Sequence, residues 1–288
     1  MGFGLVHIEA VHGQHWNCIA DDRPITELLH DVSQQEEIII GKAGKKKDSQ
    51  GRLQKGETVL AKSHSKSDIG GMIVMVNDTD ENGETIYNIW TGYPFCAKGV
   101  KHRLVLDEIQ EWENGIEALI TAYQEEGPTL TFFDPFFFKN KFRYKVGEEY
   151  EFFLAGMVYK IKPSGSQTLE LPEHEGTQFL RKHLAEKAGK PENSESIKLN
   201  LAGMAALIQT GESEDDYNFS GPVKEVDSYE FRNIEFYRIK VTVARNTVSE
   251  QDLDINIYSK KSFFENGTTP QMGKDIEGVI WLQGYLVD

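Results

Sequence analysis

The sequence predicts a mainly β, β-rich α+β fold. It would consist of two tandem, internally duplicated small antiparallel β-barrel domains, each preceded by a short helix. Three observations support this prediction: related motifs recur in the two halves, apolar and polar residues alternate along short segments, and turn-forming residues separate those segments. A β-sandwich with a similar number of strands is the alternative.

The internal repeat is the strongest of these observations. Gly71–Val76 and Gly203–Ile208 each begin with Gly-Met and continue as an apolar run. An acidic turn follows each run, and then a segment that begins with Tyr-Asn, Tyr87–Gly92 in the first half and Tyr217–Gly221 in the second. Two further pairs of segments match, 108–117 with 225–235 and 147–151 with 273–277. Duplication on this scale predicts two related domains.

The repeat divides the chain into predicted domains at residues 1–163 and 164–288. Each half is long enough to bury a core of its own. The helix of the first domain is predicted near residues 24–35, where Pro24 suits the first turn and apolar residues recur at helical spacing. The helix of the second domain is predicted near residues 177–188, which are followed by Gly189.

The linker after the first predicted helix is rich in lysine. Residues 41–66 combine this positive charge with several glycines, which predicts a surface loop. Charge runs of this kind are usually solvated, and an anion or nucleic-acid patch is the alternative interpretation.

The second half shows the strand pattern most clearly. Residues 217–231, 234–245 and 253–258 are predicted as three strands, residues 259–272 as a connecting loop, and residues 273–286 as the last strand or strands with a bend near Gly278. In the first half, Asn114-Gly115 is typical of a hairpin turn. This rhythm of strands resembles that of OB-fold proteins, which implies a small five-stranded barrel in each half. The resemblance assigns no role to any residue.

Composition and charge exclude several classes of protein. The formal net charge of −15 opposes general coating of nucleic acid. No apolar stretch approaches the ~20 residues of a membrane span, and we expect no membrane partner. Two cysteines and no recognisable signal peptide predict a cytoplasmic protein.

Motifs of known enzymes are missing from the sequence. It holds no Gly-x-Ser-x-Gly elbow, no Walker loop and no Rossmann glycine pattern. We therefore expect a protein that is not an enzyme and needs no cofactor.

A candidate metal site lies near the N-terminus. His7, His12, His15 and Cys18 supply imidazole and thiol groups, which are the usual ligands of Zn²⁺. Their spacing matches neither a zinc finger nor a helical pair of histidines. Surface histidines and a buried cysteine are the alternative interpretation.

An aromatic and basic stretch, residues 132–145, is the best functional lead. Aromatic rings stack on bases and interleaved cations neutralise phosphates, so the stretch is a candidate surface for single-stranded nucleic acid. The same rings and Arg could instead anchor a protein partner. Residues 258–264 repeat the pattern weakly. The candidate ligand- or partner-binding residues are Phe136, Phe138, Lys139, Lys141, Phe142, Arg143, Tyr144, Lys260 and Lys261.

These observations predict a non-catalytic binding or assembly protein. Its tandem OB-like domains would hold a macromolecular partner, with a protein partner or self-association as the expected case. Single-stranded nucleic-acid binding through residues 132–145 is the alternative function.

Overall fold

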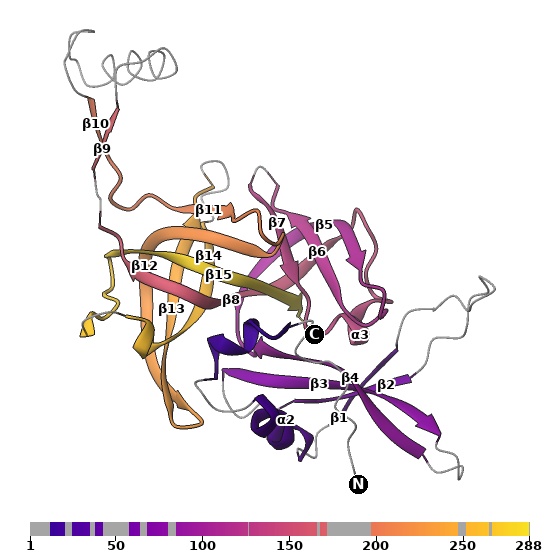
Figure 1. Ribbon diagram of the computed structural model, residues 1–288. Coiled ribbons are helices and arrows are strands. Elements are labelled where there is room, and N and C mark those ends of the chain that lie inside the picture. The colour runs from indigo at the N-terminus through magenta and orange to yellow at the C-terminus, as the bar shows by residue number, and fades with distance from the viewer. Residues whose placement is uncertain are drawn as a thin grey trace.

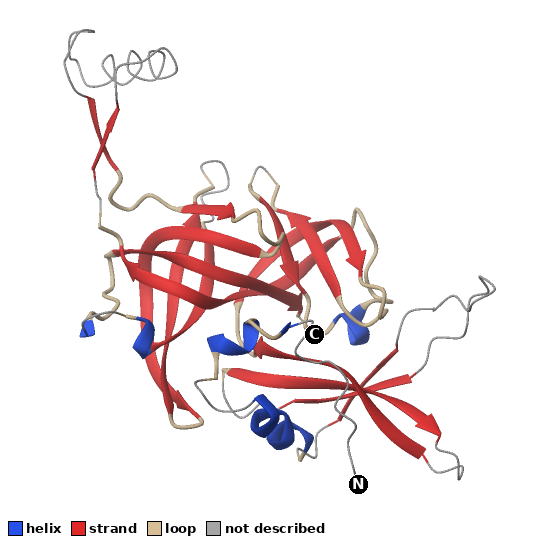
Figure 2. Cartoon of the chain, viewed as in Figure 1, coloured by secondary structure: helices blue, strands red, loops and turns tan. Residues whose placement is uncertain are grey.

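The chain folds into a mainly β structure, as the sequence predicts (Figures 1 and 2). It is a computed structural model that describes residues 12–20, 25–34, 38–42, 58–63, 68–79, 85–125, 127–165, 168–171, 197–246, 252–264 and 267–287. These residues form a nine-stranded sheet, a four-stranded sheet and a two-stranded ribbon. The ribbon pairs β9 (Thr168–Leu171) with β10 (Ile197–Asn200).

The four-stranded sheet is antiparallel and follows the chain order. Its strands are β1 (Ile38–Lys42), β2 (Thr58–Ser63), β3 (Ile69–Thr79) and β4 (Thr85–Cys96). The helix α2 (Ile25–Ser33) packs on this sheet through buried Leu29 and Val32, which confirms the predicted first helix.

The basic linker differs from the loop that the sequence predicts. Residues 58–63 form β2 because their apolar run pairs with β3, and Ala61 is fully buried. The remaining lysines of the linker lie mostly outside the described residues, as does the predicted helix 177–188.

The nine-stranded sheet contains strands from both predicted domains. Its order is β11-β12-β13-β14-β8-β15-β7-β6-β5, with additional pairings of β12 with β15 and of β8 with β5. The strands are β5 (Val100–Glu111), β6 (Ala118–Tyr123), β7 (Thr129–Phe133), β8 (Glu149–Pro163), β11 (Ala206–Gln209), β12 (Asp216–Phe231), β13 (Ile234–Ala244), β14 (Leu253–Lys260) and β15 (Asp275–Leu286). The division into domains at residue 163 stays a prediction. Strand β8, which ends at that residue, pairs with strands from both sides of the division in one sheet.

The pairings of this sheet close into two rings. The first ring contains β5, β6, β7 and β8 and is completed by β15. The second ring contains β12, β13, β14 and β15 and is completed by β8. Each ring thus uses four strands of its own segment and takes the fifth from the other segment.

Short helical turns occur at matching places in the two rings. The turn α3 (Phe137–Asn140) follows β7, and η3 (Lys261–Phe263) follows β14. The matched segments 108–117 and 225–235 both span the first hairpin of a ring. By contrast, Tyr87–Gly92 lies in the four-stranded sheet, whereas Tyr217–Gly221 lies in a ring.

The first hairpins reverse by different turns. In the first hairpin, Gly115 has a φ of 69°, but Asn114 is not at positive φ, so the predicted Asn-Gly pair lies within a longer loop that Trp112 and Glu117 close by a backbone hydrogen bond. The second ring instead uses Arg232 and Asn233, with φ of 54° and 64°, in a two-residue turn between β12 and β13. Arg232 also forms an ion pair with Asp31 of α2 at 2.7 Å, so this hairpin tip contacts the helix.

Two buried clusters hold these parts together. One fills the rings and includes Phe132, Phe152, Leu154 and Ile239. The other lies between the four-stranded sheet, the N-terminal turn η1 (His15–Cys18) and the rings, and it includes Trp281 of β15. In the described part of the chain, no helix is long and apolar enough to span a membrane.

Candidate binding surfaces

The described members of the predicted metal site, His12, His15 and Cys18, do not form a metal site. His12 and His15 lie together, with their Nδ1 atoms 3.0 Å apart, but among the described residues no group of three His, Cys, Asp or Glu side chains is placed to hold a metal ion. His7 lies outside the described residues. Cys18 is buried, and burial raises the pKa of its thiol.

His12 is instead held in a buried polar network. Its Nε2 donates to Oε1 of Glu117 at 2.6 Å, and both side chains are inaccessible to solvent. Glu117 also accepts hydrogen bonds from Thr91 and Asn114. Both carboxylate oxygens of Glu117 thus accept hydrogen bonds. Through the bond to His12, the network connects the segment before η1 to the first hairpin of the ring.

His15 lies against aromatic rings. Its imidazole stacks on Trp281 with the ring centroids 3.8 Å apart, and the indole Nε1 donates to Asp215 at 2.7 Å. Burial lowers the pKa of His15 to about 3, with a further contribution from His12. A neutral ring in this position is a packing element that joins η1 to β15.

Most rings of the aromatic and basic stretch are buried. Phe138, a predicted binding residue, is fully buried against β1. It lies so close to Gly41 that a Cβ on that glycine would be 2.3 Å from Cδ2 of Phe138. Phe136 is half-buried and packs edge-on against Phe95 and Tyr285. Phe138 therefore cannot stack on a base in this conformation, and its apolar ring serves the core instead.

Tyr144 is held by a buried carboxylate. Its hydroxyl donates to Oδ2 of Asp134 at 2.5 Å, and the Phe136 N–H donates to Oδ1 at 2.8 Å. Burial raises the pKa of Asp134 to about 7, although the two hydrogen bonds oppose that rise. Tyr144 is thus part of the internal support of this loop.

The predicted cations already have protein partners. Lys141 pairs with Glu111 at 2.7 Å and donates to the carbonyl oxygen of Gly115. Lys260 is buried and donates to the carbonyl oxygen of Ala20 at 2.9 Å. Lys261 pairs with Glu235 at 3.0 Å. A phosphate would have to displace these contacts before it could bind.

What remains exposed in this stretch is a small apolar and basic loop. Phe142 is 70 % exposed and Val146 is 58 % exposed. Lys139 and Arg143 also lie at the surface on the same connection between β7 and β8. We call residues 139–146 the Phe142 loop. An exposed aromatic ring beside Arg is the combination that anchors protein partners.

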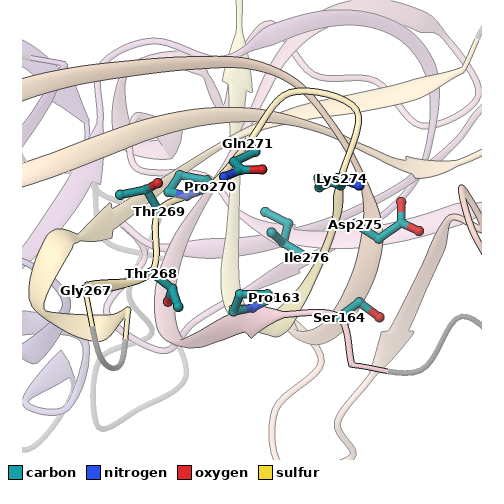
Figure 3. Close-up of a pocket in the computed structure, with 10 residues that line it drawn as sticks. All are labelled: Pro163, Ser164, Gly267, Thr268, Thr269, Pro270, Gln271, Lys274, Asp275 and Ile276. Carbon is teal, nitrogen blue, oxygen red and sulfur yellow. The ribbon is translucent and has the colours of Figure 1, made fainter.

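Two surface cavities lie on the second ring and its borders. A cavity of about 400 Å³ is lined by residues 163–164, 267–271 and 274–276. Figure 3 shows Pro163 and Ser164 on one side of this cavity and Thr268–Gln271 on another. Its lining is mainly Thr, Pro and other uncharged groups, and Asp275 Oδ2 accepts a hydrogen bond from the Gly203 N–H at 2.7 Å.

The other cavity, of about 310 Å³, is a groove across four strands, β8, β15, β12 and β11. Sequence reasoning missed it because the groove depends on which strands become neighbours. Alternation does place Lys160 and Lys162 on one face of β8, and Glu277 and Val279 on one face of β15. Only the pairing brings these faces together.

Comparison with known proteins found no match. No family model, no curated protein and no solved structure matches this chain. A function is therefore inferred from the surfaces described above.

Proposed function

We propose that this chain is a non-catalytic binding or assembly protein that holds a protein partner. The observation that carries the proposal is the exposure of Phe142, which is 70 % accessible, whereas the other phenylalanines of residues 132–145 are buried or half-buried. A large exposed ring costs solubility unless a partner covers it, and aromatic rings dominate the binding energy of protein interfaces.

The support beneath the Phe142 loop favours this role. Tyr144 and Asp134 hold one side of the loop, and Lys141 is fixed to Glu111 and Gly115. Phe142 therefore projects from a loop with ordered neighbours. Such pre-organisation reduces the entropy that binding costs.

Ion pairing favours a protein partner over single-stranded nucleic acid. On the outer face of the second ring, Arg238 pairs with Asp68 and Asp227, and Lys240 pairs with Glu225. On the first ring, Lys101 pairs with Glu151. Phosphate binding gains its free energy from Lys and Arg side chains that can pair with the phosphates, and neighbouring carboxylates compete with the phosphates for these side chains.

The proposal includes the OB-like architecture. Each ring has five strands, and each carries a short helical turn between its third and fourth strands. Both features are what we expect of a small barrel of the OB type. In this proposal, the two rings form a rigid scaffold, and the Phe142 loop contacts the protein partner.

Site-specific photo-crosslinking tests the proposal. A photoreactive phenylalanine analogue is placed at position 142 and the protein is expressed in its source cells. We expect discrete adducts that disappear when a second change, Val146→Asp, is added. The matched control is the same analogue at Met272, which is also 70 % exposed. Equal adduct patterns at both positions would overturn the proposal.

Anisotropy titration with single-stranded oligonucleotides tests the alternative. Mixed DNA and RNA oligomers are titrated at low and at high salt. We expect no binding that depends on Phe142, Arg143 and Lys139. Salt-sensitive binding that is lost when these three residues become Ala would replace the protein-partner proposal with the nucleic-acid function.

A further inference from the structure

The groove of about 310 Å³ is built from two rows of outward-facing side chains. The rows follow the register of four adjacent strands, β11, β12, β15 and β8 (Figure 1). The first row is Ala206, Ser220, Glu277 and Lys162, and the second row is Ile208, Asn218, Val279 and Lys160. The groove therefore runs across the strands, and its floor is fixed by backbone pairing.

The two rows differ in charge. In the first row, Glu277 pairs with Lys162 at 3.0 Å and accepts a hydrogen bond from Ser164 at 3.1 Å, so its carboxylate is satisfied. The second row contains Lys160 and no carboxylate. On a chain with a formal net charge of −15, this row presents a cation at one end and apolar Ile208 at the other.

Ile208 and its strand have no cover among the described residues. Ile208 is 65 % exposed, and Met204 just before this strand is 50 % exposed. In the described part of the chain, β11 pairs only with β12 and ends the order of the nine-stranded sheet. Exposed apolar side chains beside a groove of this size are typical of a binding site.

We propose that the second row binds an extended peptide segment of a partner protein, with an acidic residue at Lys160 and an apolar residue at Ile208. Charge complementarity selects the acidic end, and the exposed Ile208 selects the apolar end. Asn218, which lies between them, offers an amide that can donate to and accept from a peptide backbone.

The strand spacing sets the distance between the two binding residues of the peptide. Lys160 and Ile208 are three strand spacings apart, which is about 14 Å at about 4.8 Å per spacing. An extended chain advances about 3.4 Å per residue, so about four residues cover this distance. The expected motif is therefore an acidic residue followed, four positions later, by an apolar one. If the peptide binds in the opposite direction, the apolar residue comes first and the acidic residue follows four positions later.

This groove is separate from the Phe142 loop, and its proposed role does not depend on the function proposed for that loop. Figure 1 places α3 and β11 at different ends of the ring structure. Failure of either experiment therefore leaves the other proposal intact.

Three fluorescein-labelled peptides test the proposal by anisotropy with the full chain. The first is Gly-Glu-Ser-Thr-Ser-Leu-Gly, in which Glu and Leu are four apart. The second has Lys in place of Glu, and the third has Glu directly beside Leu. We expect the first peptide to bind at least tenfold more tightly than the other two, and its binding to weaken with salt.

A charge exchange makes the test specific. Lys160→Glu is expected to weaken the first peptide at least tenfold and to strengthen the second, while Ile208→Asp weakens both. The control is Lys101→Glu, because Lys101 is a half-exposed lysine of β5 outside the groove. It should leave all three affinities within twofold. Circular dichroism verifies that each variant is folded.

Three outcomes would overturn the proposal. The first is no binding of any peptide at millimolar concentration. The second is binding that Lys160→Glu and Ile208→Asp do not change. The third is a doubling of the mass in light scattering that Ile208→Asp abolishes, because the groove would then serve a second copy of this chain.

Discussion

The two rings each contain five strands but are closed to different extents. The second ring closes through three residue pairs between β14 and β8, which are Asn256 with Ala155, Ile257 with Gly156, and Tyr258 with Met157. The first ring closes through a single pair of β7 and β15, Phe133 with Gln283. Backbone pairing alone therefore holds the first ring less firmly.

Hydrogen bonds to the end of β4 supplement the closure of the first ring. Gln283 accepts from the Cys96 N–H at 2.9 Å and donates to the Pro94 carbonyl oxygen at 3.0 Å. Tyr93 donates from its hydroxyl to the Pro135 carbonyl oxygen at 2.7 Å. The comparison shows what the four-stranded sheet adds to the structure. The backbone pairing of β7 with β15 leaves the first ring nearly open, and contacts with β4, the last strand of the four-stranded sheet, help to close it.

The largest expected effect comes from a strand that both rings share. Phe152 of β8 is fully buried and packs against Phe132 at a centroid distance of 5.2 Å. Phe152→Ala should lower the free energy of unfolding by about 3–5 kcal/mol because it leaves a cavity. In urea, tryptophan fluorescence and far-UV circular dichroism should report one coincident transition for wild type and variant. Two separate transitions would show that the rings are independent.

A smaller effect should distinguish the two closures. Gln283→Ala leaves the buried Cys96 N–H and the Pro94 carbonyl without their side-chain partner, at an expected cost of about 1–3 kcal/mol. Asn256→Ala, at the closure of the second ring, should change stability by less than about 0.5 kcal/mol because the backbone pairs remain. Urea midpoints measure both. Equal losses would contradict the difference in closure.

The pH dependence gives the smallest expected effect. The pKa of Asp134 is raised to about 7 in the folded chain, so the carboxyl keeps its proton there after the unfolded chain has lost it. Its stabilising contribution is complete below about pH 4 and is lost as the pH rises through about 7. His15, with its pKa lowered to about 3, acts in the opposite sense: its contribution is present above about pH 6.5 and is lost as the pH falls.

Asp134→Asn isolates the carboxyl contribution from that of His15. Between pH 6 and pH 7, the wild type should lose up to about 1 kcal/mol of stability relative to this variant. Denaturant midpoints at the two pH values measure the difference. Asn140→Asp is not a suitable control because Asn140 is itself buried; Asn256→Asp, on a half-buried polar position, is the better one. A difference that does not change with pH would show that Asp134 is already ionised at pH 6.

Local features of the fold could be predicted from the sequence. Alternation along residues 234–245 and 253–258 matches β13 and β14, and the chain reverses around Gly115 where a hairpin was expected, although through a longer loop than an Asn-Gly turn. The register shift between Val279 and Ile280 lies close to the predicted bend at Gly278. These features depend on residues near one another in the chain, so a local pattern carries the information.

Features that depend on distant partners could not be predicted. The parallel pairing of β8 with β14 leaves no mark on the alternation of either strand. The similarity of Tyr87–Gly92 to Tyr217–Gly221 is misleading, because the two segments enter different sheets. Phe138 and Phe142 differ in burial because Phe138 packs into a cluster that includes distant strands and lies against β1, which spacing within residues 132–145 cannot reveal.

The reciprocal exchange of β8 and β15 affects how the chain is made. The ribosome delivers β5, β6, β7 and β8 first, yet both rings need β15, the last described strand. At about 5–20 residues per second, synthesis of the residues between β8 and β15 takes about 6–22 s, during which the edges of the early strands lack β15. Until synthesis passes residue 286, these edges are open to pairing with the same strands of a neighbouring nascent chain.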